Sequence, residues 1–374
     1  MTRTRVAVAM SGGVDSSVAA AILKEQGYDV IGFSMQLYDQ RRNETAEEVR
    51  RFGRCCALDD LYDARRVASQ LGIAHYIVNF ESEFDRLVVH SFIEDYRNGL
   101  TPSPCVLCNS RMKFDHLVKI AGDIEADCVA TGHYARVDRD EETGRHMLRK
   151  GLDEEKDQSY FLFELRQEQL ARAMFPLGDM EKHEVRRIAR RYGLEVAEKA
   201  ESQEICFVPD GDYAGFIDRR LMEDGLRTEL PAGEIVDSEG RVVGAHGGVH
   251  HFTIGQRRGL GVAHSAPLYV IELKPRENRV VVAERNQLEK KSFRAVRANW
   301  IGIVEPSHPV RALVKIRSRH SGALATLTPI GDAVVEVECD LPQMAITPGQ
   351  AAVFYSEDLV LGGGWIDREQ VSAG

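Results

Sequence analysis

Short apolar runs alternate with amphipathic stretches over roughly the first two hundred residues of the chain. Four runs have the length and composition of buried strands: residues 5–10, 30–37, 73–80 and 128–131. Between them, apolar residues recur three and four positions apart, as on one face of a helix, in residues 16–26, 58–71, 83–98 and 112–122. Strands that alternate with helices form a parallel sheet covered on both faces. We therefore predict an α/β fold whose ligands bind beyond the carboxyl ends of the strands.

The pattern changes at residues 208–212, where Val-Pro-Asp-Gly-Asp predicts a turn and a domain boundary. Up to about position 270 the chain is rich in glycine, and after it strand-like runs follow one another without a long helical pattern. These runs are residues 279–283, 310–316, 323–328, 333–338 and 351–355. We therefore expect three domains: an α/β domain at 1–208, a small central domain at 209–273, and a C-terminal β-barrel at 274–374.

The composition is that of a soluble globular protein, with 43% hydrophobic and 28% charged residues among 374. No apolar run approaches the roughly 18 residues that cross a bilayer. Residues 1–5 lead directly into the first strand without a signal-peptide pattern. We therefore expect a cytoplasmic protein that does not bind membranes.

Charge is distributed unevenly along the chain. The 48 Lys and Arg and 58 Asp and Glu give a net charge of −10. Residues 290–330 nevertheless hold eight Lys or Arg and a single Glu, a local surplus of seven positive charges. This segment predicts a basic surface that contacts nucleic-acid phosphates, although the protein as a whole is acidic.

The segment SGGVDSS follows the first strand and opens the first helix. In this context glycines expose backbone N–H groups to an anion, and the serines add hydroxyl donors. An ordinary strand-to-helix turn with a serine N-cap is the alternative. There is no G-x-x-x-x-G-K-[ST] pattern, so no P-loop lysine reaches a γ-phosphate. Asp15 suits a Mg²⁺ site better than a phosphate contact. The residues expected to bind the nucleotide here are Ala9, Met10, Ser11, Gly12, Gly13, Val14, Asp15, Ser16 and Ser17.

The odd number of cysteines, seven, argues against a disulfide framework and leaves metal binding or redox chemistry open. Cys105-x-x-Cys108 follows two prolines and precedes a predicted helix, where the pKa of a thiol is lowered. Lys113 can assist. Cys206 lies in a polar loop that ends the α/β domain. The alternative for each is a buried, unreactive thiol.

Six segments appear in an order that resembles one family: SGGVDSS, TPSPCVLCN, ATGHYAR, KDQSYFLF, ESQEICF and HFTIGQRRGLG. Together they are similar to the tRNA-specific 2-thiouridylases, which belong to the ATP pyrophosphatase (PP-loop) superfamily. The resemblance covers nearly the whole chain. It implies that ATP adenylates the 2-oxygen of the wobble uridine in tRNA, and that a cysteine persulfide then delivers sulfur, giving 2-thiouridine, AMP and pyrophosphate.

The resemblance also implies roles for single residues. Cys108 matches the catalytic cysteine, and Cys206 matches the persulfide carrier with which it closes a disulfide. Met35 and Gly132 match further ATP contacts. The residues that match tRNA contacts are Ser103, Pro104, Cys105, Lys156, Asp157, Gln158, Arg317 and Ser318. The implied partners are the anticodon arm of tRNA and a sulfur-donor or sulfur-relay protein.

Two positions depart from the family pattern. Many members have aspartate where this chain has Cys105, so the role of that acid is absent or replaced here. Many have tyrosine where this chain has Ser318, so aromatic stacking on RNA is not expected at Ser318. Three thiolates at Cys105, Cys108 and Cys206 can hold a [4Fe–4S] cluster, since cysteine is the usual cluster ligand. The replacement of an acid by a third thiol favours this cluster. Persulfide transfer with Cys105 as a bystander stays open as the alternative.

Two other functions are consistent with parts of the sequence. One is an ATP-gated tRNA-binding protein without thiolation activity, which would release no pyrophosphate. The other is an amide-forming ATP pyrophosphatase, which needs neither the cysteine pair nor a basic β domain. A basic helical stretch at 182–191 is either a solvated face or an RNA-facing one. His246, His250 and His251 invite a zinc site, but no cysteine or acid lies at metal-ligand spacing, so we expect no metal there.

Overall fold

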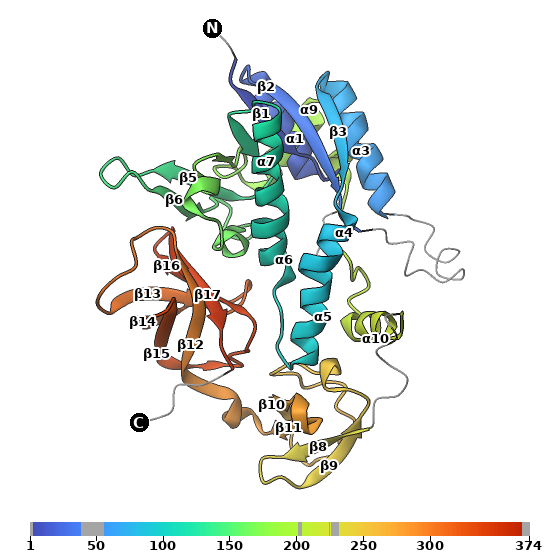
Figure 1. Cartoon of the computed structure of the whole chain (residues 1–374), viewed down its shortest axis with the longest axis vertical. Helices are drawn as coiled ribbons and strands as arrows, with labels where there is room; N and C mark the ends of the chain where they lie inside the picture. Colours follow the sequence, from blue (N-terminus) through green and yellow to red (C-terminus); the bar gives the residue numbers. More distant parts are fainter. Residues whose placement is uncertain (1–2, 39–55, 201–203, 224, 226–231, 369–374) are drawn as a thin grey trace. The chain divides into compact units, whose positions relative to one another are not determined.

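The computed structural model describes residues 3–38, 56–200, 204–223, 225 and 232–368 (Figure 1). The chain forms two compact units. The first comprises Met1–Val88, Cys105–Gln203 and Asp358–Val360, and the second Val89–Pro104, Glu204–Glu357 and Leu361–Gly374. No helix among the described residues is long and apolar enough to cross a membrane. The predicted three-domain division stays a prediction.

The first unit is built on a parallel sheet in the strand order β3-β2-β1-β4-β7. The strands are β1(Arg5–Ala9), β2(Asp29–Gln36), β3(Ala74–Asn79), β4(Cys128–Ala130) and β7(Ala173–Met174). The order reverses between β1 and β4, and in open parallel sheets a ligand crevice forms where the order reverses. The predicted α/β fold is confirmed.

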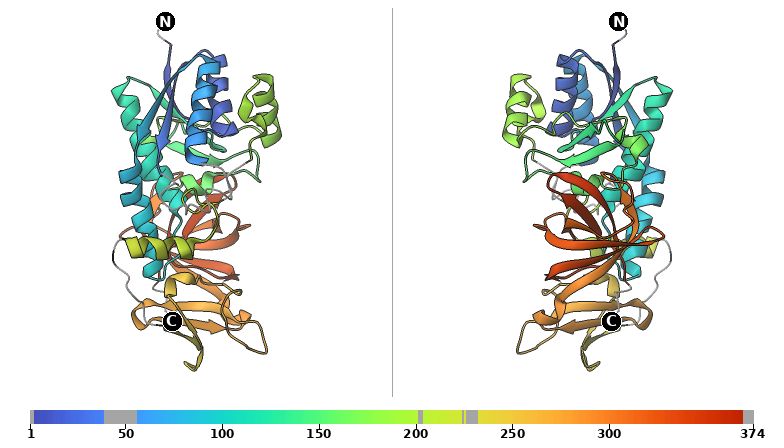
Figure 2. Two further views of the ribbon diagram at one scale, coloured as in Figure 1. Left: turned by 90° about the vertical axis from the view of Figure 1, so that its right-hand side faces the viewer. Right: turned by 90° about the vertical axis from the view of Figure 1, so that its left-hand side faces the viewer.

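Helices cover both faces of this sheet (Figures 1 and 2). Apolar residues of α1(Val14–Glu25), α3(Cys56–Leu71) and α9(Lys182–Arg191) pack in one cluster with β1 and β2. The helix α7(Asp115–Asp123) contacts β1 and β4 from the other face. The remaining elements of this unit are α4(Glu81–Phe84), η2(Asp85–Val89), α6(Pro104–Leu107), η3(Cys108–Phe114), β5(Ala135–Arg139), β6(His146–Lys150), η4(Ser159–Leu162), α8(Gln167–Leu170) and η5(Glu195–Glu198).

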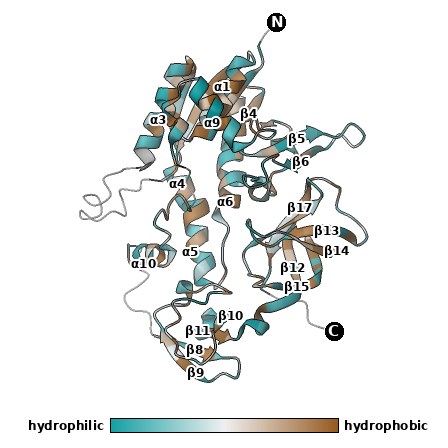
Figure 3. Cartoon of the chain, turned by 180° about the vertical axis from the view of Figure 1, so that it is seen from behind, coloured by the Kyte–Doolittle hydropathy of each residue, from teal (hydrophilic) through white to brown (hydrophobic). Residues whose placement is uncertain are grey.

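The second unit contains a closed antiparallel barrel and a smaller sheet. Pairing between β12 and β17 closes the barrel. The predicted barrel is thus confirmed, although the strand-like runs of the sequence include neither β12 nor β17. Its strands are β12(Glu289–Trp300), β13(Val310–Lys315), β14(Ala323–Gly331), β15(Val334–Met344), β16(Ala351–Ser356) and β17(Leu359–Ile366). Barrel strands carry both apolar and polar stretches in Figure 3. Alternate residues such as Ala312 and Val314 are buried, as expected for side chains that fill the inside of a barrel.

The smaller sheet has the strand order β10-β11-β8-β9 and its own apolar core. The sequence predicts only β11 of its four strands. Glycines lie in β8 and β9 and weaken their period-two pattern, whereas β10 is missed although it contains no glycine. Its elements and the neighbouring helices are α5(His90–Arg97), α10(Tyr213–Glu223), β8(Gly233–Asp237), β9(Val242–His246), η6(Val249–His251), β10(Tyr269–Lys274), η7(Pro275–Glu277), β11(Arg279–Ala283) and η8(Arg285–Leu288).

Candidate active site

The SGGVDSS segment forms the loop between β1 and α1 at the carboxyl edge of the sheet. The N-cap of α1 is Gly13, and no side chain caps the helix, so the serine-capped turn considered as the alternative is not formed. Serine hydroxyls instead fold the loop on itself. Ser17 Oγ donates to the carbonyl of Gly13 (2.8 Å), and the N–H of Ser11 donates to Ser16 Oγ (3.1 Å). The first-turn N–H groups of α1 have no intrahelical acceptor, which suits an anion such as a phosphate.

Close backbone contacts explain two glycines of this region. Gly12 has φ +77°, and a Cβ on it would lie 2.1 Å from the carbonyl oxygen of Asp60 at the start of α3. A Cβ on Gly132, just after β4, would lie 2.6 Å from the nitrogen of Ser16. The sequence places Gly132 far from the loop, and the fold brings its backbone against α1. Met35, near the end of β2, lies at the same edge of the sheet.

Asp15 is neutralised by side chains from two other segments. Lys182 Nζ, at the start of α9, lies 2.8 Å from each carboxylate oxygen, and the hydroxyl of Tyr134 donates to Oδ1 (2.9 Å). A cation on Asp15 must therefore displace Lys182, which the sequence does not predict. Gln158, expected to contact tRNA, accepts the N–H of Tyr134 (3.0 Å) and so supports this group.

Lys199 joins the loop to α3, and no sequence motif identifies it. Its ammonium contacts Asp60 Oδ1 and Asp63 Oδ2 (2.5 Å each) and the carbonyl of Gly12 (3.1 Å). Burial alone would lower the pKa of Lys199, but hydrogen bonds from its ammonium to the two carboxylates outweigh burial and raise it. Burial would raise the pKa of Asp63, and Lys199 together with Arg66 reverses that effect and lowers it.

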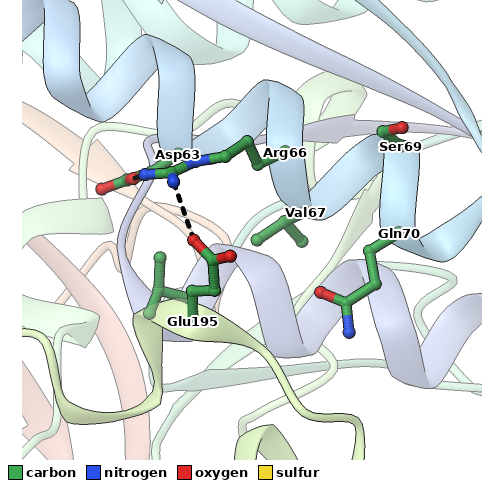
Figure 4. A pocket seen from close by; sticks show the side chains of 7 residues that line it. Asp63, Arg66, Val67, Ser69, Gln70 and Glu195 are labelled. Atoms are coloured by element: carbon green, nitrogen blue, oxygen red, sulfur yellow. Dashed lines mark hydrogen bonds and ion pairs between the residues drawn. The ribbon is translucent and has the colours of Figure 1, made fainter.

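A groove of about 410 Å³ lies beside this cluster, between α3 and η5. Figure 4 shows Arg66 of α3 reaching Glu195 of η5, and their charged groups are 2.9 Å apart. Val67, Ser69 and Gln70 complete the lining on α3. Asp63, which bonds Lys199, lines the groove, whereas none of its lining residues belongs to the SGGVDSS loop. We therefore do not assign the nucleotide to it.

Cys105 and Cys108 lie within a helical stretch that begins at Pro104, about two turns earlier than the start at residue 112 that the sequence predicts. Cys108 opens the π-helical turn η3, a distortion frequent at functional sites. The expectation of lowered thiol pKa values is wrong. Burial raises the pKa of Cys108, and the charge of Lys113 offsets this only in part. Cys105 is solvent-exposed, yet the protein around it desolvates the thiolate enough to raise its pKa as well.

Cys206 is exposed and lies in the second unit, whereas Cys105 and Cys108 belong to the first. Its joint action with Cys108 stays a prediction. Residues of the second unit hold the backbone that precedes the cysteine pair. Gln350 Nε2 donates to the carbonyls of Thr101 (3.0 Å) and Pro102 (3.1 Å), and Ser103 is buried beside them. Gln350 is a supporting residue that no motif indicates.

The expected tRNA-contacting segment Lys156–Gln158 is partly used inside its own unit. Asp157 Oδ1 accepts the N–H groups of Gly151 (3.1 Å) and Ser159 (3.0 Å). Lys156 is partly exposed. A contact of this segment with tRNA stays a prediction.

The basic surface predicted at 290–330 is smaller than its charge count implies, because β15 supplies acids. Arg311 pairs with Asp340 (2.6 Å), Arg294 with Glu336 (3.0 Å) and Lys291 with Glu338 (3.5 Å). Those acids lie just outside the segment that was counted. Arg317 and Arg319, after β13, are exposed, and Ser318 between them is partly buried.

The basic helix α9 faces its own unit through several of its arginines. Arg186 donates to the carbonyls of Ala197 (2.6 Å) and Lys199 (3.2 Å). Arg190 pairs with Glu198, and Arg191 with Glu25. These bonds favour the structural interpretation of the helix over an RNA-facing one.

Three family models match consecutive parts of the chain. The tRNA methyl transferase HUP domain matches residues 4–210, the tRNA methyl transferase PRC-barrel domain matches 221–284, and the aminomethyltransferase beta-barrel domain matches 290–366. Together with the parallel sheet and its glycine loop, these matches define a HUP-type α/β protein that carries two β domains.

Curated relatives extend this similarity over the whole chain. The tRNA-specific 2-thiouridylase MnmA of Solibacter usitatus is 55% identical over 98% of this chain and 100% of its own length. The enzyme of the same name from Koribacter versatilis is 52% identical over 96% of this chain and 98% of its own. This chain belongs to the tRNA-specific 2-thiouridylase family.

Proposed function

We propose that this protein is a tRNA-uridine 2-sulfurtransferase, which uses ATP to convert the wobble uridine of tRNA into 2-thiouridine. The observation that carries the proposal is the end-to-end similarity to 2-thiouridylases, 55% identity over 98% of the chain. The structure supports it with a loop that suits phosphates and with a cysteine pair at the start of a helix. The predicted cytoplasmic location is proposed with it.

The first step is adenylation of the uridine. The 2-oxygen attacks the α-phosphate of ATP, and pyrophosphate leaves. The N–H groups at the start of α1 stabilise the negative charge on the phosphates, since the helix dipole and unpaired donors point there. AMP is a far better leaving group than a carbonyl oxygen, so the second step becomes feasible.

The second step moves sulfur to C2 of the adenylated base. In the persulfide route, the terminal sulfur on Cys206 attacks C2 and AMP departs with the original oxygen. The Cys108 thiolate then attacks the remaining S–S bond, which releases the thiolated base and leaves a Cys108–Cys206 disulfide. A thiol reductant must reopen that disulfide, and a sulfur-donor protein must reload Cys206.

Two inorganic groups, Mg²⁺ and a [4Fe–4S] cluster, would be held by different residues of the protein. Mg²⁺ prefers oxygen ligands and commonly binds with substrate phosphates. We propose that it enters with ATP, because Asp15 is already bonded to Lys182 and Tyr134. For a cluster, Cys105 and Cys108 stand three residues apart on one helical stretch and supply two of the three thiols it needs. A cluster would supply an iron-bound sulfide in place of the persulfide.

The proposal is tested by incubating the full-length protein with ATP, a sulfide source and unmodified tRNA. We expect AMP and pyrophosphate in amounts that depend on tRNA, and 2-thiouridine in nuclease digests analysed by mass spectrometry. ADP and phosphate as the main products would contradict the adenylation step. ATP-dependent tRNA binding without pyrophosphate would instead favour the ATP-gated binding protein. AMP formation that needs ammonia but no tRNA would favour the amide-forming enzyme.

A further inference from the structure

Three side chains of the second unit converge outside the proposed active site. Asp218 lies on α10, and His250 and His251 are consecutive residues of the short helix η6. His250 Nε2 lies 2.8 Å from Asp218 Oδ1, and His251 Nε2 lies 3.0 Å from Oδ2. In the part of the chain that the structure describes, these are the three His, Cys, Asp or Glu side chains whose ligand atoms all lie within 4.8 Å of one another.

The sequence does not reveal this set. It shows the two histidines but no acid near them at metal-ligand spacing. Asp218 lies on α10, which the strands β8 and β9 separate from η6 in the chain. Folding of α10 against η6 supplies the missing carboxylate. The expectation that the histidines lack an acidic partner is therefore wrong.

The geometry is close to that of a metal site. Ligand atoms that hold Zn²⁺ at about 2.0–2.1 Å in a tetrahedron are roughly 3.3 Å apart. His250 Nε2 and His251 Nε2 lie 2.8 Å and 3.0 Å from the two different oxygens of Asp218, slightly closer than this spacing. One ligand atom from each of the three residues lies within 4.8 Å of the others, so small side-chain rotations are enough to enclose an ion. The two imidazole rings meet edge to face, with centroids 4.4 Å apart, so both Nε2 atoms reach one carboxylate.

Burial shows that the site is built into the fold and still accessible. The side chain of His250 is 4% exposed, whereas those of His251 and Asp218 are 29% and 25% exposed. Gly248 makes room for the buried ring, since a Cβ there would lie 2.4 Å from His250 Cε1. An ion can thus enter from the side of His251, and a water molecule can complete the coordination.

We propose that Asp218, His250 and His251 bind one divalent transition-metal ion of the Zn²⁺ type and so fasten α10 to η6. Two imidazoles and one carboxylate suit zinc and its neighbours, whereas Mg²⁺ and Ca²⁺ prefer oxygen ligands alone. When the ion binds, each imidazole directs the lone pair of its Nε2 atom to the metal. The ring then carries its proton on Nδ1. This site is independent of the thiolation chemistry.

The test uses Co²⁺ as a spectroscopic probe on the full-length chain with Cys105, Cys108 and Cys206 replaced by serine. We expect one Co²⁺ per chain, visible d–d absorption typical of nitrogen and oxygen ligands, and displacement by Zn²⁺. Binding of Zn²⁺ should also raise the melting temperature. An absence of d–d absorption, or a sulfur-to-cobalt charge-transfer band as the main signal, would overturn the proposal.

Variants then assign the ligands. Asp218→Asn and His251→Gln should each weaken Co²⁺ binding by at least tenfold. His183→Gln is the matched control, because His183 is also paired with an acid, Glu181 (2.9 Å), but has an exposed side chain on α9. Unchanged binding in His251→Gln, or an equal loss in the control, would contradict the assignment. If a ligand variant does not fold, X-ray absorption of the zinc-loaded parent decides: two imidazoles in the metal shell support the site, and a shell without imidazole overturns it.

Discussion

Gly132 contacts the first turn of α1 with its backbone, and there is no room for a side chain between them. The contact sets how closely the end of β4 approaches the loop that we propose binds ATP. A methyl group 2.6 Å from the nitrogen of Ser16 must push one backbone away from the other. Such overpacking typically costs about 1–3 kcal/mol.

We expect Gly132→Ala to lower the free energy of unfolding by about that amount and to weaken ATP binding at least tenfold. Chemical denaturation and equilibrium ATP binding measure the two effects. Gly122→Ala is the matched control, since nothing lies within 4 Å of its added Cβ in α7. The control should be neutral or stabilising. Equal ATP affinity in Gly132→Ala and the parent would contradict the expected contact.

A substitution at Cys105 distinguishes the two proposed routes of sulfur transfer. Under the persulfide route it is a bystander, and under the cluster route it is one of three required thiols. Cys105→Ala should therefore be tolerated in the first case and abolish thiolation in the second. The measurement is 2-thiouridine formation by anaerobically purified protein, together with its iron content.

Cys108→Ser and Cys206→Ser serve as controls for that experiment, because both routes require these thiols. Full activity in Cys206→Ser would contradict both routes. An iron-free protein that is nevertheless inactivated by Cys105→Ala would show that the thiol has some other role.

At the scale of elements, two lysines hold the phosphate loop to neighbouring helices. Lys182 begins α9 and bonds Asp15, and Lys199 bonds Gly12 and two acids of α3. Each ammonium sits between elements that are distant in sequence. Removing one leaves partly buried carboxylates without their cation, which costs about 1–3 kcal/mol.

We expect Lys199→Met to destabilise the protein by about 1–3 kcal/mol at pH 7. The pKa of Asp63 is lowered in the folded state, so its stabilising effect is present above the unfolded pKa near 3.8 and is lost as pH falls. The difference between parent and variant should therefore shrink in acid, as measured by urea unfolding from pH 7 to 3. Arg66→Met, which removes a more exposed partner of Asp63, is the control and should have a smaller effect.

The barrel strand β15 neutralises part of the basic segment, so arginines on neighbouring strands are not equivalent. Arg317 is exposed and donates a long bond to the carbonyl of Met344 (3.4 Å), whereas Arg311 is held by Asp340. We expect Arg317→Ala to weaken tRNA binding and to reduce the log–log salt slope by up to about one. Arg311→Ala is the control and should change the slope less. Equal slopes for Arg317→Ala and the parent would remove Arg317 from the RNA contact.

At the scale of the whole molecule, the proposed reaction uses one thiol from each of the two units. If Cys206 carries a persulfide, a single turnover without reductant should convert Cys108 and Cys206 into a disulfide. Mass spectrometry of non-reduced peptides after one turnover measures this product. We expect it only when both ATP and tRNA are present. Turnover that leaves both thiols free would favour the cluster route.

Local sequence patterns are sufficient to predict much of the secondary structure of this protein. Period-two and helical patterns predict the parallel sheet apart from β7, the helices that cover it, and the barrel strands β13 to β16, because apolar residues must face a core. They do not predict β12 and β17. The SGGVDSS loop is also predictable, since the strand, the glycines and the helix are contiguous in the chain. The strands β8 and β9 of the central sheet are missed where glycines break the alternation, and the helical stretch that holds the cysteine pair begins about two turns earlier than predicted.

By itself, the sequence determined the fold class, the phosphate loop and the family resemblance, all of which depend on residues that are neighbours in the chain or on their order. Only the tertiary structure decided which charges are compensated: Asp15 by Lys182, Asp60 and Asp63 by Lys199, and Arg311 by Asp340. It also decided that the cysteine pKa values rise and that Asp218 meets two histidines. The physical reason is common to these cases. Electrostatic interactions and burial depend on distances in space, and such distances between remote residues exist only after the elements have packed.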